Sequence, residues 1–392
     1  MELLNFIQNN QITTYDSLKN ILEAEPFKLK IKEDSSFPDL FLIYINHDSN
    51  CDISLVRECN GIILDKKTLK IVCHTFEKCI DDDSKIDEKI DIDNLYVEYA
   101  FEGTLIRLFY YNDVWRISTK KCIDASKSKW LSNKNFMELF SECLNGLNIE
   151  SNLNINNCYS FILTHPENKI FVNYTLPQLI HISSRDMTTL QEIDVNIGIY
   201  KQMREKVNII NSNEIISYYK NLQFLNYEGI ILIDNKFNRQ KIKTYIFMKA
   251  RQLWGNTNNR FMHYLELRKN PQLLEEYLGF FDYDKNRFIE YEGHISELAK
   301  KILKIYLDKN IYKKISKVPY YFNKIIYKLH GDFLKDKVRT NYDKVMQALL
   351  ELDAKKICFI INHLTKDLSK NLNEQIGANQ NIDENYEYLM EE

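Results

Sequence analysis

Two lysines and an acid-glycine pair near the middle of the chain have residue types suited to binding phosphate. Glu228 and Gly229 stand at the entry of a predicted buried strand, residues 227–234. In the strand that follows, Lys241 and Lys243 alternate with apolar residues, so both lysines project from one face. That face is polar, and we expect it to bind phosphate.

A second acid-glycine pair, Glu102 and Gly103, lies between a predicted strand and a predicted β-hairpin. The strand is residues 96–100. The hairpin arms, residues 105–111 and 114–119, alternate apolar and polar side chains and are joined by an Asn-Asp turn. A strand, a turn and a hairpin in this order predict a shallow ledge of nucleotide size.

Strands and helices together must hold these residues in place. The pattern predicts further strands at residues 40–45, 57–65, 70–74, 159–164, 169–174 and 179–183, and helices at 14–22, 129–144, 197–207 and 213–222. From about residue 256 to 368 the apolar period becomes helical, with Leu298, Ile302 and Tyr306 on one face. We therefore predict an α+β protein, in which an antiparallel-sheet domain precedes an all-α domain.

The changes in apolar period and composition along the chain set the expected domain limits. Residues 1–50 are expected to form part of the first domain, residues 51–254 its main body, residues 255–370 the helical domain and residues 371–392 an acidic tail.

Composition favours a globular protein in a reducing compartment. The chain has 392 residues, 44% hydrophobic and 27% charged, without an apolar stretch long enough for a membrane span or a leader sequence. Its eight cysteines include no Cys-x-x-Cys pair, which disfavours both a zinc site and a disulfide scaffold. We expect a cytoplasmic protein with no membrane partner.

Positive charge is concentrated in residues 300–344, which hold 13 Lys or Arg against 4 Asp or Glu in a chain of net charge −3. Tyrosines and phenylalanines interleave with those cations, as on surfaces that neutralise phosphates and stack bases. A solvated helix face with tyrosines in the core is the equally weighted alternative. The RNA-binding candidates are Lys313, Lys314, Lys317, Lys324, Lys328, Lys335, Lys337 and Arg339.

Taken together, residues 50–250 resemble the adenylyltransferase domain of RNA ligases of the bacteriophage T4 RNA ligase 1 type, in the covalent nucleotidyltransferase superfamily. RNA-ligase-like proteins of large cytoplasmic DNA viruses look most similar. The resemblance covers about half of the chain through several motifs in the family's order. The matching segments are 60–61, 100–103, 104–107, 161–169, 182–186, 227–230 and 241–244.

The resemblance implies an ATP-grasp-like ligase domain with roles for individual residues. Glu228 would lie near the α-phosphate and a Mg²⁺ ion, and Lys241 and Lys243 would hold phosphate oxygens. Glu102 would orient the sugar. The implied nucleotide-binding set is completed by Gly103, Arg107 and Arg185.

Three positions depart from the family pattern. Ala100 stands where the family has the lysine that forms lysyl-AMP, Asn60 replaces an arginine, and Ile162 replaces a glutamate. Between Ile90 and Lys120 the only cations are arginines, so no lysine in that span substitutes for the missing one.

These departures predict a pseudoenzyme that binds RNA, including tRNA-like RNA, in a viral RNA-processing or transcription complex. Its location would be the cytoplasm or the virion, and ATP with Mg²⁺ would bind noncovalently and weakly or not at all. One alternative is an active ATP-dependent RNA ligase represented by a Lys-to-Ala mutant at position 100. Another is a protein-interaction scaffold without RNA binding.

Two further features receive structural interpretations. His165 lies in a predicted turn and is expected to bond locally rather than act in catalysis. Trp115, Trp130 and Trp254 are expected to anchor the core or a domain junction.

Overall fold

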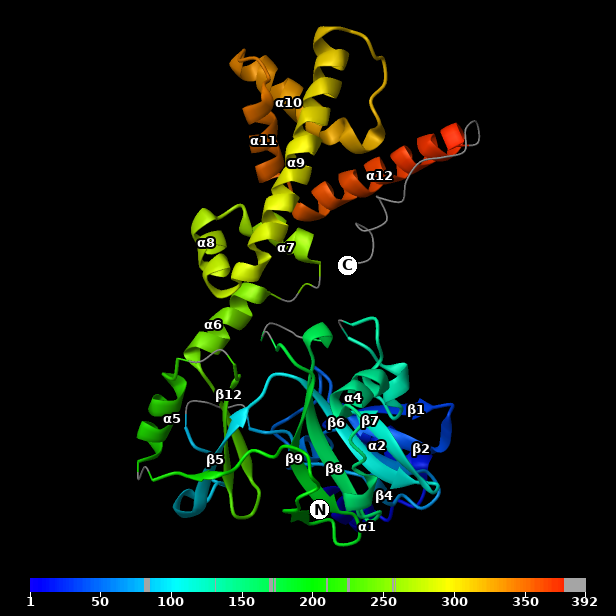
Figure 1. The fold of residues 1–392 in the computed structure, drawn as a ribbon. Coiled ribbons are helices and arrows are strands. Elements are labelled where there is room, and N and C mark those ends of the chain that lie inside the picture. Colours follow the sequence, from blue (N-terminus) through cyan, green and yellow to red (C-terminus); the bar gives the residue numbers. More distant parts are fainter. Residues whose placement is uncertain are drawn as a thin grey trace. The chain divides into compact units, whose positions relative to one another are not determined.

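The chain forms two compact units, Met1–Lys249 and Ala250–Glu392. The computed structural model describes residues 1–80, 85–130, 132–168, 172, 174–208, 211–223, 226–255, 257 and 259–376. Antiparallel sheets in the first unit and helices in the second confirm the predicted α+β order (Figure 1). The finer domain limits at residues 50 and 370 stay predictions, and residues 377–392 of the predicted tail lie outside the described part.

The first sheet has the order β1-β2-β3-β4 and packs against the N-terminal helices. Thr14 caps one of them by accepting a hydrogen bond from the Ser17 N–H, which stabilises its first turn. The elements are α1 (Glu2–Asn9), α2 (Tyr15–Glu23), β1 (Lys30–Asp34), β2 (Phe37–Tyr44), α3 (Ser54–Glu58), β3 (Ile62–Asp65) and β4 (Ile71–Cys73).

The second sheet contains the predicted hairpin and has the order β10-β9-β8-β6-β7. Asn112 and Asp113 both have positive φ, which suits a tight hairpin turn that matches strand twist. Helix α4 packs on β8 and β9 through Leu139 and Phe140. The elements are β6 (Thr104–Tyr111), β7 (Val114–Thr119), α4 (Phe136–Leu144), β8 (Asn157–Thr164), β9 (Gln178–Asp186) and β10 (Glu192–Ile193).

The third sheet unites strands far apart in sequence, in the order β11-β5-β12-β13. Ala100 pairs with Gly229, and Gly229 pairs with Lys243 on its other side. Helix α5 lies beside β12 and β13 and buries Ile215 and Ile216 against them (Figure 1). The elements are β5 (Leu95–Ala100), β11 (Glu205–Lys206), α5 (Ser212–Lys220), β12 (Gly229–Asp234) and β13 (Arg239–Lys243).

Several predicted elements were wrong. The helix predicted from residue 129 begins at Phe136, because Asn135 forms a capping box with Glu138 that fixes the start there. Residues 197–207 are not helical; the backbone of this segment bonds to neighbouring strands, as in the His181 N–H to Tyr200 O bond of 2.9 Å. Trp130 is 60% exposed and anchors no core. Part of the predicted strand at 169–174 lies outside the described residues.

The second unit is helical, as predicted, and its core includes Leu298, Ile302, Val345 and Leu349. None of the helices described here is long and apolar enough to span a membrane. The elements are α6 (Tyr245–Trp254), which crosses the unit limit, and α7 (Arg260–Leu267), α8 (Pro271–Phe280), α9 (Lys285–Tyr306), α10 (Asn323–Asp336), α11 (Tyr342–Glu351) and α12 (Ala354–Ile376).

The tightest backbone approach in the third sheet predicts a strong effect of Gly229→Ala. A Cβ atom at position 229 would lie 2.0 Å from the Ile242 carbonyl oxygen, so β12 and β13 must separate. We expect a loss of about 3 kcal/mol in the free energy of unfolding, measured by urea titration. The control is Gly293→Ala in α9, where a Cβ meets nothing within 4 Å and should stabilise the helix by about 0.5–1 kcal/mol. Equal urea midpoints for the two variants would contradict this assignment.

Candidate functional site

A cavity of about 530 Å³ opens in the first unit between the second and third sheets. This volume lies in the usual range for sites that bind small molecules. Ala100 from β5, Gly103 from the following turn and Lys241 from β13 all line it. Its charged lining residues are Lys78, Glu98, Lys120, Lys121, Lys129, Lys201, Glu228, Arg239 and Lys241.

The acid-glycine pair of Glu228 and Gly229 is fixed by the backbone of the third sheet. The Glu228 N–H donates to the Ala100 carbonyl oxygen at 2.7 Å, and the Thr244 N–H donates to the Glu228 carbonyl oxygen at 3.2 Å. The Glu228 carboxylate forms an ion pair with Lys241, Oε2 to Nζ, at 2.8 Å. The structure therefore brings Glu228, Lys241 and Ala100 together at one cavity.

The acid-glycine pair of Glu102 and Gly103 is more enclosed. Gly103 lines the cavity, and a Cβ there would lie 2.6 Å from both Ile162 Cγ2 and the Leu163 carbonyl oxygen. Glu102 is buried, and one of its carboxylate oxygens accepts a hydrogen bond of 2.7 Å from the Val172 N–H. The Tyr174 hydroxyl donates to the Glu102 carbonyl oxygen at 2.7 Å. Glu102 thus ties the segment around residue 172 to the cavity wall.

Four of the seven predicted nucleotide-binding residues do not line the cavity: Glu102, Arg107, Arg185 and Lys243. Arg107 is fully buried, and its Nη2 donates to the Thr119 carbonyl oxygen at 2.5 Å, which favours a structural role. Arg185 donates from Nε to the Thr75 carbonyl oxygen at 2.6 Å, and burial lowers the pKa of its guanidinium. Gly103, Glu228 and Lys241 do line the cavity. Contact of any of the seven with nucleotide stays a prediction.

Sequence reasoning missed Lys120, which follows β7 and lines the same cavity as Ala100. Lys120 itself ends the span, beginning at Ile90, in which the sequence shows no lysine to replace the one missing at position 100. Following the hairpin register would have found it, because the arm that starts after Gly103 pairs with the arm that ends at Thr119. Burial lowers the pKa of the Lys120 ammonium, and the charges of Lys241 and Arg107 lower it further.

Arg239, at the start of β13, is a second cavity residue that the sequence did not indicate. Its Nη1 donates to Glu192 Oε2 at 2.8 Å, and its guanidinium lies 4.8 Å from the centre of the Phe76 ring. Glu192, the acid that neutralises Arg239, lies on β10 of the second sheet. Nothing in the local sequence around Arg239 indicates this pairing.

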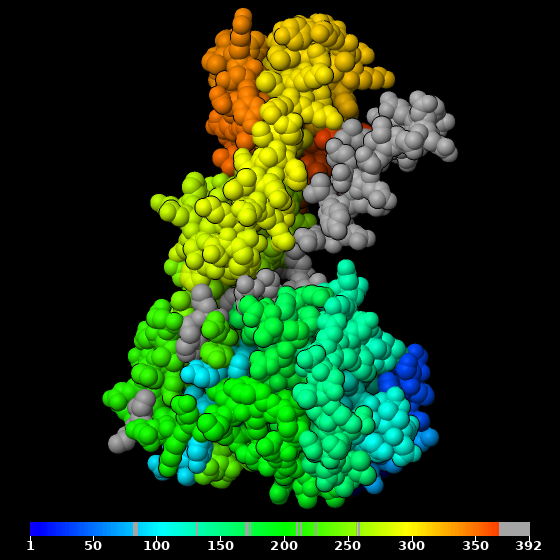
Figure 2. All heavy atoms as spheres, in the orientation of Figure 1, coloured from blue at the N-terminus to red at the C-terminus, as the bar shows by residue number. Residues whose placement is uncertain are grey.

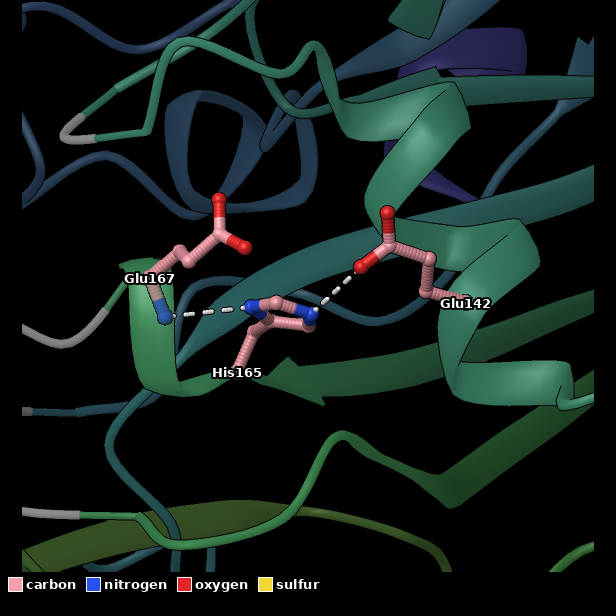
Figure 3. Close-up of side chains that lie close together, drawn as sticks. All are labelled: Glu142, His165 and Glu167. Carbon is pink, nitrogen blue, oxygen red and sulfur yellow. Dashed lines mark hydrogen bonds and ion pairs between the residues drawn. The ribbon is translucent and has the colours of Figure 1, made fainter.

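A separate cluster of Glu142, His165 and Glu167 has spacing compatible with a metal ion, with one ligand atom of each within 4.8 Å of the others (Figure 3). The bonding disfavours that role. His165 Nδ1 accepts the Glu167 N–H at 3.1 Å, so a neutral ring carries its proton on Nε2, 3.1 Å from Glu142 Oε2.

A lysine already neutralises both carboxylates of this cluster. Lys134 Nζ lies 2.9 Å from Glu142 Oε1 and 2.7 Å from Glu167 Oε1. These contacts agree with the local bonding expected of His165, and they join the start of α4 to the turn after β8.

In the second unit, all eight predicted RNA-binding cations are exposed. The segment lies on the surface in Figure 2, in yellow to orange. Tyr312, Tyr320 and Tyr327 are also exposed, whereas Tyr306 and Tyr321 are buried. Tyr306 and Tyr321 therefore belong to the core, as the alternative interpretation expects, and base stacking by the exposed tyrosines stays a prediction.

The eight exposed cations between Lys313 and Arg339 form a basic surface, and their charge is not fully balanced by acids. Lys328 pairs with Glu351, and Lys314 Nζ lies 4.0 Å from Asp308 Oδ1. Lys324 instead lies beside Lys356, and that proximity lowers the pKa of Lys324. Two adjacent ammonium groups favour the binding of an anion between them.

Comparisons with known proteins relate the chain to virus proteins. No protein-family model matches it. It is 30% identical over 188 residues to an immediate-early protein ICP-46 homolog of Invertebrate iridescent virus 3, covering 45% of this chain and 41% of that protein. The homolog from Invertebrate iridescent virus 6 is 26% identical over 310 residues, covering 68% and 66%.

A third relative, a candidate bifunctional polynucleotide kinase/RNA ligase of Autographa californica nuclear polyhedrosis virus, is 24% identical over 265 residues. That match covers 62% of this chain and 37% of the relative, so the chain spans less than two thirds of each of the three virus proteins.

Among solved structures, a mutant RNA ligase of Naegleria gruberi with ATP and Mn superposes with a TM-score of 0.34 and 11% identity, over 45% of this chain and 60% of that one. The same ligase with pyrophosphate gives a TM-score of 0.32 and 9% identity, over 41% and 52%.

His181 on β9 lines the cavity as a buried neutral ring. Its Nε2 lies 2.8 Å from Ser184 Oγ and 3.2 Å from the Ser183 carbonyl oxygen. Burial, together with the nearby charge of Lys201, lowers the pKa of His181 to about 4. The folded protein therefore resists protonating a ring that the unfolded chain protonates near pH 6.5.

This difference predicts a loss of stability in mild acid. Below pH 6.5 the unfolded state binds the extra proton, so the contribution of His181 is present above that pH and is lost as the pH falls toward 4. Between pH 7 and 4.5, wild type should lose about 2–3 kcal/mol more unfolding free energy than His181→Gln, measured by urea titration. The control is His47→Gln, an exposed ring that should leave the wild-type pH dependence unchanged. Parallel pH profiles for wild type and His181→Gln would refute the assignment.

Proposed function

We propose that this protein is RNA-ligase-like, that it binds a nucleoside triphosphate in the cavity and RNA on the helical unit, and that it forms no lysyl-nucleotide at position 100. The observation that carries the proposal is the cavity itself, where Glu228 and Lys241 are paired beside Ala100. Three motif residues, Gly103, Glu228 and Lys241, line this cavity, while residue 100 offers no amine.

Charge supports a polyphosphate ligand. Seven of the charged residues on the cavity wall are Lys or Arg and two are acids, one of which, Glu98, is paired with Arg204 at 2.6 Å. The remaining acid, Glu228, is paired with Lys241. Further cations are left to offset phosphate charge, which is what a triphosphate requires.

The same residues fit Mg²⁺ bound mainly through the ligand. Mg²⁺ in nucleotide sites is typically held by one or two carboxylates together with phosphate oxygens and water. Glu228 is the carboxylate that would hold it here, and the ion would offset charge on the phosphates.

Exposed lysines next to exposed tyrosines support RNA as the partner of the helical unit. Lysines neutralise backbone phosphates, and tyrosine rings such as Tyr312 and Tyr327 can stack on unpaired bases. Because the three relatives are virus proteins, we further propose a role in RNA processing or transcription within a viral assembly, in the cytoplasm or the virion. The kinase/RNA ligase relative makes RNA the preferred nucleic acid.

Nucleotide binding can be tested with Lys241→Ala. We expect calorimetric titration with ATP and Mg²⁺ to show binding to wild type and about tenfold weaker binding to the variant, because one charge-assisted phosphate contact is lost. The matched control is Lys66→Ala, which also removes a lysine from an ion pair of the first unit, with Glu33, but away from the cavity. Binding that is equal in both variants, or absent from wild type, would reject the nucleotide proposal.

RNA binding can be tested by its salt dependence. Replacing Lys313, Lys314 and Lys317 together by Ala should reduce the slope of log K against log salt by about 2, because about 0.7 counterion is released per phosphate contact to single-stranded RNA. The control triple variant replaces the exposed Lys67, Lys70 and Lys85 of the first unit. An unchanged slope would remove the basic surface from the interface, and no wild-type binding at low salt would leave the scaffold alternative.

A further inference from the structure

One lysine in the cavity differs from the others in its contacts. Lys201 is paired with Asp194, and Lys241 with Glu228. Lys121 and Lys129 are exposed to solvent. In lysines of these two kinds, an adjacent carboxylate or bulk water stabilises the ammonium.

Lys78 and Lys120 are the remaining lysines of the wall. Lys78 Nζ lies 3.4 Å from Cys51 Sγ. Within the described part of the chain, the Lys120 side chain forms neither an ion pair nor a hydrogen bond. Among the cavity lysines that are partly shielded from solvent, Lys78, Lys120, Lys201 and Lys241, Lys120 is therefore the one without such a partner.

The backbone around Lys120 is held firmly. Thr119 and Cys122 close a tight turn, with the Thr119 N–H donating to the Cys122 carbonyl oxygen at 2.9 Å. Arg107 Nη2 donates to the Thr119 carbonyl oxygen at 2.5 Å. This buried guanidinium fixes the end of β7, so the turn presents Lys120 to the cavity in a defined position.

Gly61 closes the turn from the other side. Its φ of +91° favours glycine, and a Cβ at this position would lie 3.0 Å from the Lys120 carbonyl oxygen and 3.2 Å from its Cα. The backbone of Lys120 thus packs directly on that of Gly61. The turn from Thr119 to Cys122 and the segment at Gly61 thus both fix the backbone of Lys120.

The surroundings of Lys120 favour a neutral amine. Burial, which removes water that would stabilise the ammonium, is the largest effect and lowers the pKa of Lys120. Cys79 opposes it, Lys241 and Arg107 lower the pKa further by repulsion, and Glu228 has the smallest opposing effect. A partly neutral lysine amine beside cations is the usual form of an activated lysine nucleophile.

We propose that Lys120 is the nucleophile of a nucleotidyl-transfer step in this cavity, replacing the amine that Ala100 lacks. The neutral Nζ attacks the α-phosphorus of a bound nucleoside triphosphate. A P–N bond forms, the P–O bond to pyrophosphate breaks, pyrophosphate leaves, and the amine releases one proton to solvent. The Lys241 ammonium lies beside this path and offsets charge on the phosphates. The inference rests on the proposed nucleotide binding.

The test is direct labelling of the full-length protein. Wild type is incubated with Mg²⁺ and ATP labelled at the α-phosphate, quenched in detergent, and digested for mass spectrometry. We expect one AMP adduct, on Lys120, and at least a hundredfold less label on Lys120→Arg. The control is Lys127→Arg, whose lysine pairs with Asp34 away from the cavity and whose labelling should equal that of wild type. A parallel reaction with GTP reports which base is accepted.

Two further measurements separate the possible failures. ATP binding and urea unfolding of Lys120→Arg, compared with wild type, show whether a loss of label reflects misfolding, and Ala100→Lys shows whether an amine at position 100 takes the label. Wild type that binds ATP without labelling, or that labels on another residue, would overturn the Lys120 assignment while leaving the proposed binding intact. Wild type that binds no ATP would remove both.

Discussion

The pairing of β5 with β12 is the constraint on which the cavity depends. Ala100 and Glu228 are 128 positions apart in sequence, yet a backbone hydrogen bond of 2.7 Å joins them. The ladder continues from β12 to β13, which brings Lys241 to the same edge. Antiparallel pairing sets this register because a slip of one residue would turn Glu228 and Lys241 away from the cavity. The close approach at Gly229 leaves no room for a Cβ atom at this position of the pairing.

The pattern of the sequence was sufficient for the parts of the fold that local rules decide. Period-2 alternation predicted the β6–β7 hairpin, and the acid-glycine pairs predicted strand ends where Ala100 and Glu228 do meet. The helical region after residue 256 was equally clear. Prediction failed where tertiary contacts replaced local preference. Residues 197–207 have helical periodicity, but their backbone groups find partners in β5 and β9.

The candidate site was harder to predict because its walls come from two sheets. Glu228 and Lys241 lie on adjacent strands and could be paired by register alone. Lys120 could also have been found from the register of the β6–β7 hairpin. Arg239 instead pairs with Glu192 of another sheet, a contact that no spacing rule along the chain contains. Arg107, a motif arginine predicted to bind nucleotide, is fully buried and supports the turn at Thr119, and its contact with nucleotide stays a prediction.

Because Arg107 is buried, the two units should respond differently to a change in ionic strength. Mobile ions screen charges that they can approach, and Arg107 has no exposed surface. Its field therefore acts on the cavity at any ionic strength. The lysines of the helical unit are open to solvent, and their attraction for a polyanion fades as salt is added. If the proposed ligands bind, a rise in ionic strength would therefore weaken the binding of a polyanion to the helical unit more than that of a small anion to the cavity.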